Sequence, residues 1–189
     1  MHNQDTFTGP SFPLSNRMAR AIWNLAWGLF FRSSPVWCHG WRRLMLRAFG
    51  ARIGRGVHVY PAVRIWAPWN LEIGDESGIG NGVNLYAQDR IRIGRRVVIS
   101  QGTHLCTGTH DYRVPGYPLR TRPIDVGDHA WVAAEVFIHP GVRIGTGTVI
   151  GARAVVTRDM PDWMICAGHP CAPLKPRPPL DDIRTHTHT

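Results

Sequence analysis

One histidine in this sequence stands where its side chain could remove a proton from a substrate. The segment Leu105-Cys-Thr-Gly-Thr-His-Asp-Tyr112 places His110 before Asp111 and before a stretch rich in proline and arginine. An imidazole with an ordinary pKa of about 6.5 can take the proton of an attacking hydroxyl near neutral pH. Asp111 could orient that ring, contact a substrate or cap the following turn. Taken alone, His110 could equally have a structural or surface role, so its chemistry depends on the elements that place it.

Those elements follow a period of six residues. Aliphatic side chains recur without a slip at positions 126, 132, 138, 144, 150 and 156, and earlier in triplets that begin at 53, 73 and 93. Neither an α-helix, with a period of about 3.6, nor an ordinary alternating strand gives this spacing. Short parallel strands ended by corners do, with three sides to each coil and a central column of aliphatic side chains. The alternative is a β-sandwich with accidental periodicity.

Glycine follows the aliphatic residue in many of these repeats. It stands at positions 54, 74, 80, 94, 127, 145 and 151. Because glycine adopts positive φ at no steric cost, we expect these glycines to form the corners of the coils. The 20 glycines and 15 prolines of the chain agree with such a turn-rich β architecture.

The interruptions of the period indicate where a site could lie. The triplets repeat every 20 residues, the last coils repeat every 18, and the phase resumes only at Val126. A loop over residues 111–125 therefore leaves the coil at one edge. Neighbouring strands lie about 4.8 Å apart, so side 85–90 should lie beside side 105–110. This stacking brings Tyr86 and Gln88 near His110.

The N-terminal third has a different pattern. Residues 1–52 lack the period, and we predict an amphipathic helical segment there. Pro35 and Gly50 are typical of the start and end of a helix, which predicts a helix over 35–49. Its two faces contain Val36, Trp37, Trp41, Leu44 and Ala48 on the apolar side, and His39, Arg42, Arg43 and Arg47 on the polar side. In residues 16–31 a wide apolar face (Ile22, Trp23, Leu25, Trp27, Leu29 and Phe30) lies opposite Arg17, Arg20 and Asn24. Both helices could cover the open end of the β-helix or contact a membrane.

The net charge of +9 comes mainly from this segment. Residues 1–56 contain eight arginines and one acid, whereas residues 57–189 contain 14 basic and 12 acidic residues. This distribution argues against nucleic acid as a partner and favours an anionic lipid surface at residues 16–50. The longest apolar run, at 22–31, is too short to cross a membrane, and the first 15 residues lack a signal-peptide pattern. We expect a cytoplasmic protein, with peripheral contact at the inner face of the membrane as a further hypothesis.

The repeats resemble those of the left-handed parallel β-helix acyltransferases, whose handedness is an exception among β crossovers. The segments 105–112, Pro123-Ile-Asp-Val-Gly-Asp-His-Ala-Trp-Val132 and Ile150-Gly-Ala-Arg-Ala-Val-Val-Thr-Arg158 are similar to the maltose and galactoside O-acetyltransferase branch. Gly40-Trp-Arg-Arg-Leu44 and Val63-Arg-Ile-Trp-Ala-Pro-Trp-Asn70 most resemble colanic-acid (exopolysaccharide) acetyltransferases. The resemblance covers roughly residues 15–175. It implies a homotrimer with active sites between subunits and acetyl-CoA as the donor.

The resemblance also implies roles for individual residues. His110 takes the position of the catalytic histidine of the family. Tyr86 and Gln88 take the positions of acceptor contacts, where Gln88 replaces an asparagine, and Asp111 is a further candidate for substrate binding. The positions that line the groove for acetyl-CoA are Trp131, Ala134, Ala152, Arg153, Thr157 and Arg158. Small residues there would let the pantetheine arm approach the backbone, and the arginines could bind the phosphates.

Metal catalysis is the less favoured alternative. The same fold hosts zinc-dependent γ-type carbonic anhydrases, which need three histidines at a subunit interface. His104 and His139 are separated by about two coils' worth of chain, but Ile144 stands where a companion histidine is expected. We therefore expect no metal, and we interpret residues 185–189, Thr-His-Thr-His-Thr, as a frayed tail. The four cysteines form no Cys-x-x-Cys pair, and we expect buried or incidental thiols.

The sequence thus predicts an acetyl-CoA-dependent O-acetyltransferase that modifies a saccharide or lipid-linked saccharide in exopolysaccharide biosynthesis. We divide the chain into an N-terminal helical segment (1–52), a left-handed β-helix (53–169) with the inserted loop (111–125), and a Pro-rich tail (170–189). Two other functions stay open, N-acetylation of an amino sugar and a non-catalytic β-helix scaffold.

Overall fold

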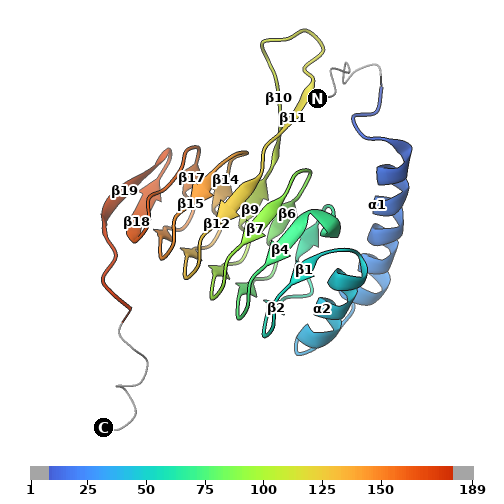
Figure 1. Cartoon of the computed structure of the whole chain (residues 1–189), viewed down its shortest axis with the longest axis horizontal. Helices are drawn as coiled ribbons and strands as arrows, with labels where there is room; N and C mark the ends of the chain where they lie inside the picture. The colour runs from blue at the N-terminus through green and yellow to red at the C-terminus, as the bar shows by residue number, and fades with distance from the viewer. Residues whose placement is uncertain (1–8, 181–189) are drawn as a thin grey trace.

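A computed structural model describes residues 9–180 and shows a three-sided parallel β-helix with helices against its first coils (Figure 1). Sheet A contains β1 (Arg52–Ile53), β4 (Leu71–Ile73), β7 (Ile91–Ile93), β12 (Ile124–Val126) and β15 (Arg143–Ile144). Sheet B contains β2 (His58–Val59), β5 (Gly78–Ile79), β8 (Val98–Ile99), β13 (Trp131–Val132), β16 (Val149–Ile150), β18 (Met164–Gly168) and β19 (Cys171–Pro176). Sheet C contains β3 (Arg64–Ile65), β6 (Asn84–Tyr86), β9 (His104–Cys106), β14 (Phe137–Ile138) and β17 (Val155–Val156). A short 3-10 turn, η2 (Pro68–Asn70), precedes β4.

The strand registers confirm the coils predicted from the period of six. The partners in sheet A run Ile53, Ile73, Ile93, Val126 and Ile144, and those in sheet C run Leu85, Leu105 and Ile138. All eight side chains are at most 7% exposed and form the central column. Side 85–90 therefore lies beside side 105–110, as predicted, and the alternative of a β-sandwich is wrong.

The glycines of the repeat have a different role from the predicted one. None of the seven has positive φ, and a Cβ at Gly74 would lie 2.7 Å from the carbonyl carbon of Gly94 in the next coil. Positive φ occurs two residues after the repeat glycine, where Glu76 (61°) and Arg96 (53°) adopt it as non-glycine residues. The prediction was wrong because the close approach of neighbouring coils, and not the corner conformation, excludes a side chain at these positions.

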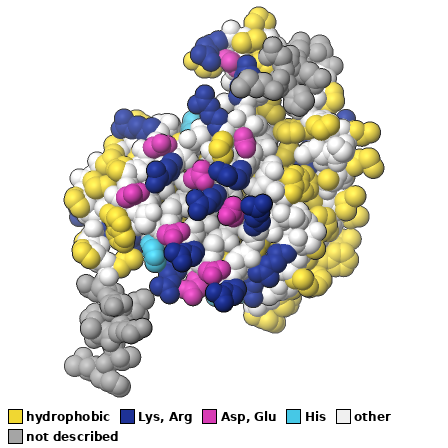
Figure 2. Space-filling model, viewed as in Figure 1, with side chains coloured by type: hydrophobic (Ala, Val, Ile, Leu, Met, Phe, Trp, Pro, Cys, Tyr) yellow, Lys and Arg dark blue, Asp and Glu magenta, His cyan; other side chains and the backbone are white. Residues whose placement is uncertain are grey.

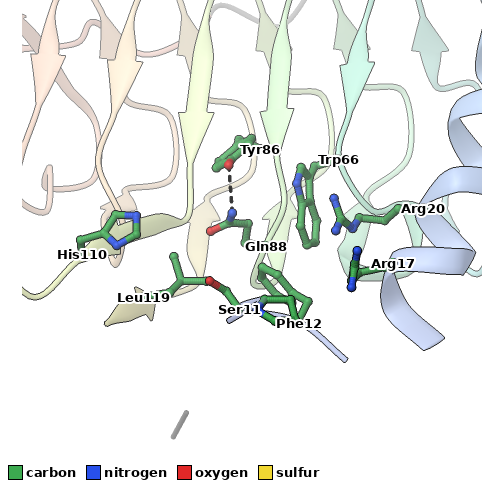
Figure 3. A pocket seen from close by; sticks show the side chains of 10 residues that line it. Ser11, Phe12, Arg17, Arg20, Trp66, Tyr86, Gln88, His110 and Leu119 are labelled. Atoms are coloured by element: carbon green, nitrogen blue, oxygen red, sulfur yellow. Dashed lines mark hydrogen bonds between the residues drawn. The ribbon is translucent and has the colours of Figure 1, made fainter. Parts of the chain in front are cut away.

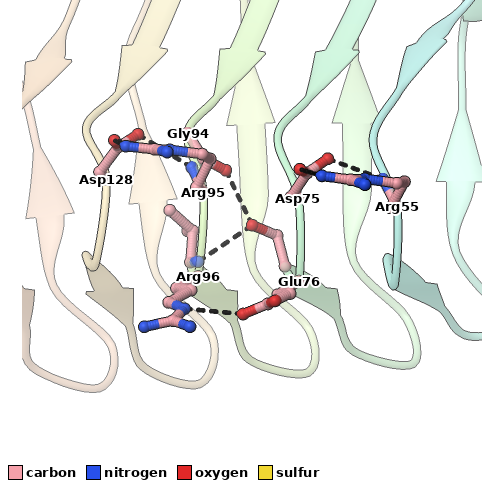
Figure 4. Close-up of polar contacts among 9 residues, drawn as sticks. Arg55, Asp75, Glu76, Gly94, Arg95, Arg96 and Asp128 are labelled. Carbon is pink, nitrogen blue, oxygen red and sulfur yellow. Dashed lines mark hydrogen bonds and ion pairs between the residues drawn. The ribbon is translucent and has the colours of Figure 1, made fainter.

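One corner between sheets A and B carries a row of acids and arginines (Figure 4). The carboxylate of Asp75 accepts the backbone N–H of Arg55 at 2.7 Å, and that of Asp128 accepts the backbone N–H of Arg95 at 2.9 Å. The guanidinium of Arg95 also lies 3.2 Å from Asp128. Exposed ion pairs contribute about 0–1 kcal/mol each, so their main effect is to satisfy corner amides and to neutralise these arginines.

The inserted segment is a hairpin arm over residues 108–121, and the predicted bounds of 111–125 are wrong. Strands β10 (Gly108–His110) and β11 (Leu119–Thr121) pair antiparallel and project from the body (Figure 1). The N–H of Arg122 donates to the carbonyl of Thr107 at 2.9 Å, which closes the arm at its base. The chain can therefore re-enter sheet A at once, and Ile124–Val126 is already strand β12.

The first helix divides its apolar residues between two sides. It consists of α1 (Leu14–Ala26) and a π-helical continuation, η1 (Trp27–Phe31). The indole N–H groups of Trp23 and Trp27 donate to the carbonyls of Ile65 and Val63, at 2.7 and 2.9 Å. The other apolar residues of this helix that face outward are Leu14, Met18, Ile22, Leu25, Leu29 and Phe30. The single apolar face predicted for residues 16–31 is therefore wrong, because the two indoles turn toward the β-helix, where their N–H groups donate to backbone carbonyls.

The second helix, α2 (His39–Ala48), turns Arg42, Met45 and Leu46 inward and leaves the predicted apolar face outside. Arg42 is fully buried and donates to the carbonyl of Val59 at 2.6 Å, while Trp41 and Leu44 on the apolar face are 46% and 59% exposed. Neighbouring donors reach the first coil in the same way: Arg43 to Val57 O at 2.8 Å and Arg47 to Ile53 O at 3.0 Å. The first coil of a solenoid leaves strand carbonyls without partners, and these side chains supply the missing donors.

Helix α2 also begins later than the predicted residue 35. The hydroxyl of Ser34 donates to the carbonyl of Phe31 instead of capping a helix. The guanidinium of Arg42 binds the carbonyls of Pro35 and Val36, at 2.8 and 2.5 Å, which holds this turn outside the helix.

The ordered β-helix extends beyond the predicted boundary at residue 169. Strand β19 pairs antiparallel with β18, so residues 171–176 are not part of a tail. Cys166 and Cys171 are both buried between these strands and the core, and burial raises the pKa of the Cys171 thiol to about 11. Arg177 donates to the carbonyls of His129 and Gly147. The histidine-containing end, 185–189, lies outside the described residues.

Candidate active site

His110 ends strand β10 at the base of the arm, where sheet C gives way to sheet A. Its Nδ1 lies 2.6 Å from the carbonyl oxygen of Tyr117 across the hairpin. A carbonyl only accepts, so Nδ1 carries the proton and donates it to Tyr117. The lone pair of the neutral ring is then on Nε2, which makes this nitrogen the base.

Asp111 holds the tip of the arm and makes no hydrogen bond to His110. Its side chain is only 11% exposed and lies 3.1 Å from Nε of Arg113 and 3.6 Å from Nε of Arg120. The hydrogen bonds from the side chain and the backbone of Arg113 keep the pKa of the Asp111 carboxyl below its usual value. The capping role is thus present, the ring is oriented by Tyr117, and substrate contact by Asp111 stays a prediction.

Tyr86 and Gln88 lie in one pocket with His110, as the coil stacking predicted (Figure 3). The amide nitrogen of Gln88 donates to the hydroxyl of Tyr86 at 2.9 Å. The amide oxygen of Gln88 is buried and has no hydrogen-bond partner among the described residues. A Cβ at Gly108 would collide with this oxygen, so the glycine leaves room for the amide. A buried oxygen without a donor is costly, and a hydroxyl of a bound ligand would satisfy it.

Two pockets meet at His110. The smaller, of about 340 Å³, lies between the start of α1, the edge of sheet C and the arm. The larger, of about 790 Å³, continues along the arm and is lined by His139 and Thr157 among others. A base between two pockets is the arrangement that a reaction between two substrates needs.

Sequence reasoning missed several residues of the smaller pocket. Residues 10–12, Arg17, Arg20, Trp66 and Leu119 line it, although only His110, Tyr86 and Gln88 had been assigned to a site. The segment 10–20 is between 46 and 109 residues away from the other lining residues, so no local spacing connects them. The only signal was the pair Arg17 and Arg20 on one side of a predicted helix.

The residues predicted to bind the donor do not gather in one chain. Thr157 lines the larger pocket, but neither pocket at His110 includes Trp131, Ala134, Ala152, Arg153 or Arg158. Trp131 lies in β13 of sheet B, where its indole donates to Ser100, whereas the arm leaves from sheet C. Arg153 pairs with Glu135 at 2.6 Å. These six assignments stay predictions.

Within residues 9–180 no three His, Cys, Asp or Glu side chains are placed to share a metal ion. His104 and His139 each pack against the ring of Phe137, with centroid distances of 4.9 and 5.3 Å. Burial lowers the pKa of His104. No helix in the described part of the chain is long and apolar enough to span a membrane.

Several known proteins are similar to this chain in sequence and fold. Residues 123–158 match the family described as bacterial transferase hexapeptide (six repeats). The chain is 39% identical over 178 residues to WcaF of Escherichia coli (strain K12), covering 94% of this chain and 98% of the relative, whose name assigns it provisionally as a colanic acid biosynthesis acetyltransferase. It is 30% identical over 138 residues to the galactoside O-acetyltransferase of the same strain, covering 71% and 68%. The hexapeptide-repeat acetyltransferase VCA0836 of Vibrio cholerae, solved with acetyl-CoA bound, has a TM-score of 0.76 at 25% identity, covering 87% of this chain and 88% of that one.

Proposed function

The chain belongs to the hexapeptide-repeat acetyltransferases, and from this membership we propose that it transfers the acetyl group of acetyl-CoA to a saccharide hydroxyl in exopolysaccharide biosynthesis. The predicted left-handed parallel β-helix is the fold of this family. The observation that carries the proposal is His110, whose Nε2 stands as a base between two pockets, one for each substrate.

The transfer follows from the tautomer of His110. As the hydroxyl oxygen of the acceptor bonds to the thioester carbonyl carbon, Nε2 takes its proton. The carbon–sulfur bond then breaks, and the imidazolium returns the proton to the leaving thiolate. The products are an acetyl ester and the free thiol of CoA. The carbonyl of Tyr117 keeps the ring in place and holds the proton on Nδ1 throughout the transfer.

Substituting His110 tests this role. His110→Ala should lower the turnover at least about 100-fold, while acetyl-CoA binding measured by calorimetry is retained. His58→Ala, which removes an exposed histidine on sheet B, is the matched control and should behave like the wild type. Wild-type turnover in His110→Ala would reject the role. Alkali releases acetate from an ester but not from an amide, so product lability separates O-acetylation from N-acetylation.

We further propose that the enzyme works as a homotrimer. Five of the six predicted donor residues line neither pocket at His110 in a single chain, so a neighbouring copy is needed to complete the site. Sedimentation equilibrium should give three times the chain mass of 21.2 kDa. Mixing inactive His110→Ala with a Trp131→Ala variant that no longer binds acetyl-CoA should restore activity in mixed trimers. A monomer with full activity would contradict this proposal.

The outward face of the N-terminal helices supports a peripheral contact with the inner face of the membrane from the cytoplasm. Ten large apolar side chains there are 46–81% exposed: Leu14, Met18, Ile22, Leu25, Leu29, Phe30, Val36, Trp37, Trp41 and Leu44. They form a rim of hydrophobic surface beside the charged β-helix (Figure 2). Residues 9–71 contain nine arginines and no Asp or Glu, so the surface around the rim complements anionic lipid.

Vesicle co-sedimentation tests the membrane contact. The protein should sediment with phosphatidylcholine vesicles that contain phosphatidylglycerol, and the double substitution Trp37→Ser and Leu44→Ser should abolish this. Leu174→Ser, which removes an equally exposed apolar side chain from β19, is the control and should not change binding. Absence of binding by the wild type, or self-association through this face instead, would overturn the proposal.

A further inference from the structure

Two arginines of α1 line the pocket beside the proposed base. Arg17 and Arg20 are three residues apart in the helix, and their side chains lie on the wall of the smaller pocket, with Tyr86, Gln88 and His110 on the other walls (Figure 3). Arg20 is held in place, since its Nε donates to Asn16 at 3.0 Å and its guanidinium carbon lies 4.3 Å from the centre of the Trp66 ring.

Neither arginine has a carboxylate partner among residues 9–180. The ion pairs of that part of the chain bind other arginines: Arg55, Arg90, Arg92, Arg95, Arg96, Arg113, Arg120, Arg143 and Arg153. None of the described residues that line the smaller pocket is acidic. The described chain thus leaves the charge of two guanidinium groups unbalanced on the wall of a concave site. Such groups are suited to bind an oxyanion of a ligand.

The polar groups of the same pocket are also suited to a ligand that carries a hydroxyl group. No described residue donates to the buried amide oxygen of Gln88, and Nε2 of His110 needs a hydroxyl group within reach whose proton it can take. One ligand that satisfies all three features carries hydroxyl groups and an anionic substituent. Resting on the proposed acetyl transfer, we propose that the acceptor is an anionic saccharide whose phosphate or carboxylate is bound by Arg17 and Arg20.

The geometry assigns this anion to the acceptor and not to acetyl-CoA. The smaller pocket contains Tyr86 and Gln88, two of the three predicted substrate-binding residues, and none of the predicted donor residues; the third, Asp111, lines the larger pocket. The one donor residue near the base, Thr157, lies in the larger pocket, which has its own arginines, Arg113, Arg120 and Arg122. The pocket arginines also lie on the helix whose outward side carries the apolar rim, so a saccharide attached to a membrane lipid through phosphate would reach them from the membrane side.

Steady-state kinetics with matched acceptors tests the assignment. The acceptors are galactose, galactose 1-phosphate and galacturonate, with the corresponding glucose series. In Arg17→Gln and Arg20→Gln the KM for the charged acceptors should rise about tenfold or more, while the KM for the neutral sugar and for acetyl-CoA stays unchanged. Arg20→Lys should recover part of the loss. Arg52→Gln, which removes an exposed arginine of β1 that has no ion pair among residues 9–180, is the control.

The outcomes separate the two anions and the two proposals. An effect limited to the sugar phosphates identifies phosphate, and one limited to the uronates identifies carboxylate. Equal KM values for charged and neutral acceptors in the wild type, or a changed KM for acetyl-CoA in the variants, would overturn the assignment. Calorimetry with galactose 1-phosphate and galacturonate needs no turnover. Binding that Arg20→Gln loses supports the subsite even if acetyl transfer fails, and absence of binding to the wild type refutes it.

Discussion

Replacing Arg42 with methionine tests whether the arginine face of α2 holds the N-terminal cap on the β-helix. Methionine keeps the apolar stem that packs in this buried position but removes every donor. Four hydrogen bonds are lost, to the carbonyls of Val59, Pro35 and Val36 and to the hydroxyl of Ser34. The chain between the two helices is then no longer tied to the first coil.

The loss in free energy of unfolding depends on which of these acceptors stay buried without a donor. Val59 O keeps a contact with Nδ1 of His39 at 3.0 Å, and the exposed Pro35 and Val36 can be hydrated. The cost therefore lies below the sum of four charged hydrogen bonds, and we expect about 3 kcal/mol, which is typical of breaking a buried polar network. For a chain of this size that corresponds to a drop in Tm of about 6–12 °C.

Thermal unfolding followed by far-UV circular dichroism at one fixed protein concentration measures this drop. Arg52→Met removes an exposed arginine of β1 and should leave Tm within about 2 °C of the wild type. Arg42→Lys keeps the charge but has a single donor nitrogen, so its Tm should be intermediate. If Arg42→Met had the same Tm as the wild type, side-chain donors would not be what holds the cap. The explanation for why the apolar face of α2 points outward would then be wrong.

Three further results are expected. Gly74→Ala should lower the free energy of unfolding by about 1–3 kcal/mol in urea titrations, because the new Cβ meets the next coil. A Cβ at Gly78 meets open space, so Gly78→Ala should cost less than about 0.5 kcal/mol. Equal effects of the two substitutions would contradict the packing role of the repeat glycine. Gly108→Ala should displace the Gln88 amide and raise the KM for the acceptor without lowering Tm, and an unchanged KM would argue against Gln88 as a contact. Burial lowers the pKa of His104, so below about pH 6.5 the unfolded chain binds a proton more readily than the folded chain does. The free energy of unfolding should therefore fall with decreasing pH, by up to about 1.4 kcal/mol per pH unit. Urea titrations of His104→Gln should show a shallower fall, and an unchanged slope would exclude His104 as its source.

The position of the site along the coil could be read from the sequence because stacking is a consequence of local spacing. Once the period fixes Leu85 beside Leu105, the residues that follow each strand must lie at the same corner, which placed Tyr86 and Gln88 near His110. The rest of the pocket could not be derived in this way. Arg17 and Arg20 come from a helix that no repeat register connects to sheet C, so their place depends on how α1 packs.

The coil, its register and the side that carries His110 can all be derived from the order of the residues, because a period of six with buried aliphatic residues fits only stacked short strands. The sequence also showed that both N-terminal helices are amphipathic. Which face of each helix turns inward depends on the surface against which the helix packs. An apolar face packs inward when the surface it meets is apolar, but the first coil presents bare carbonyls, and these bind Arg42, Trp23 and their neighbours. The same requirement leaves the apolar rim outside and brings Arg17 and Arg20 to the pocket.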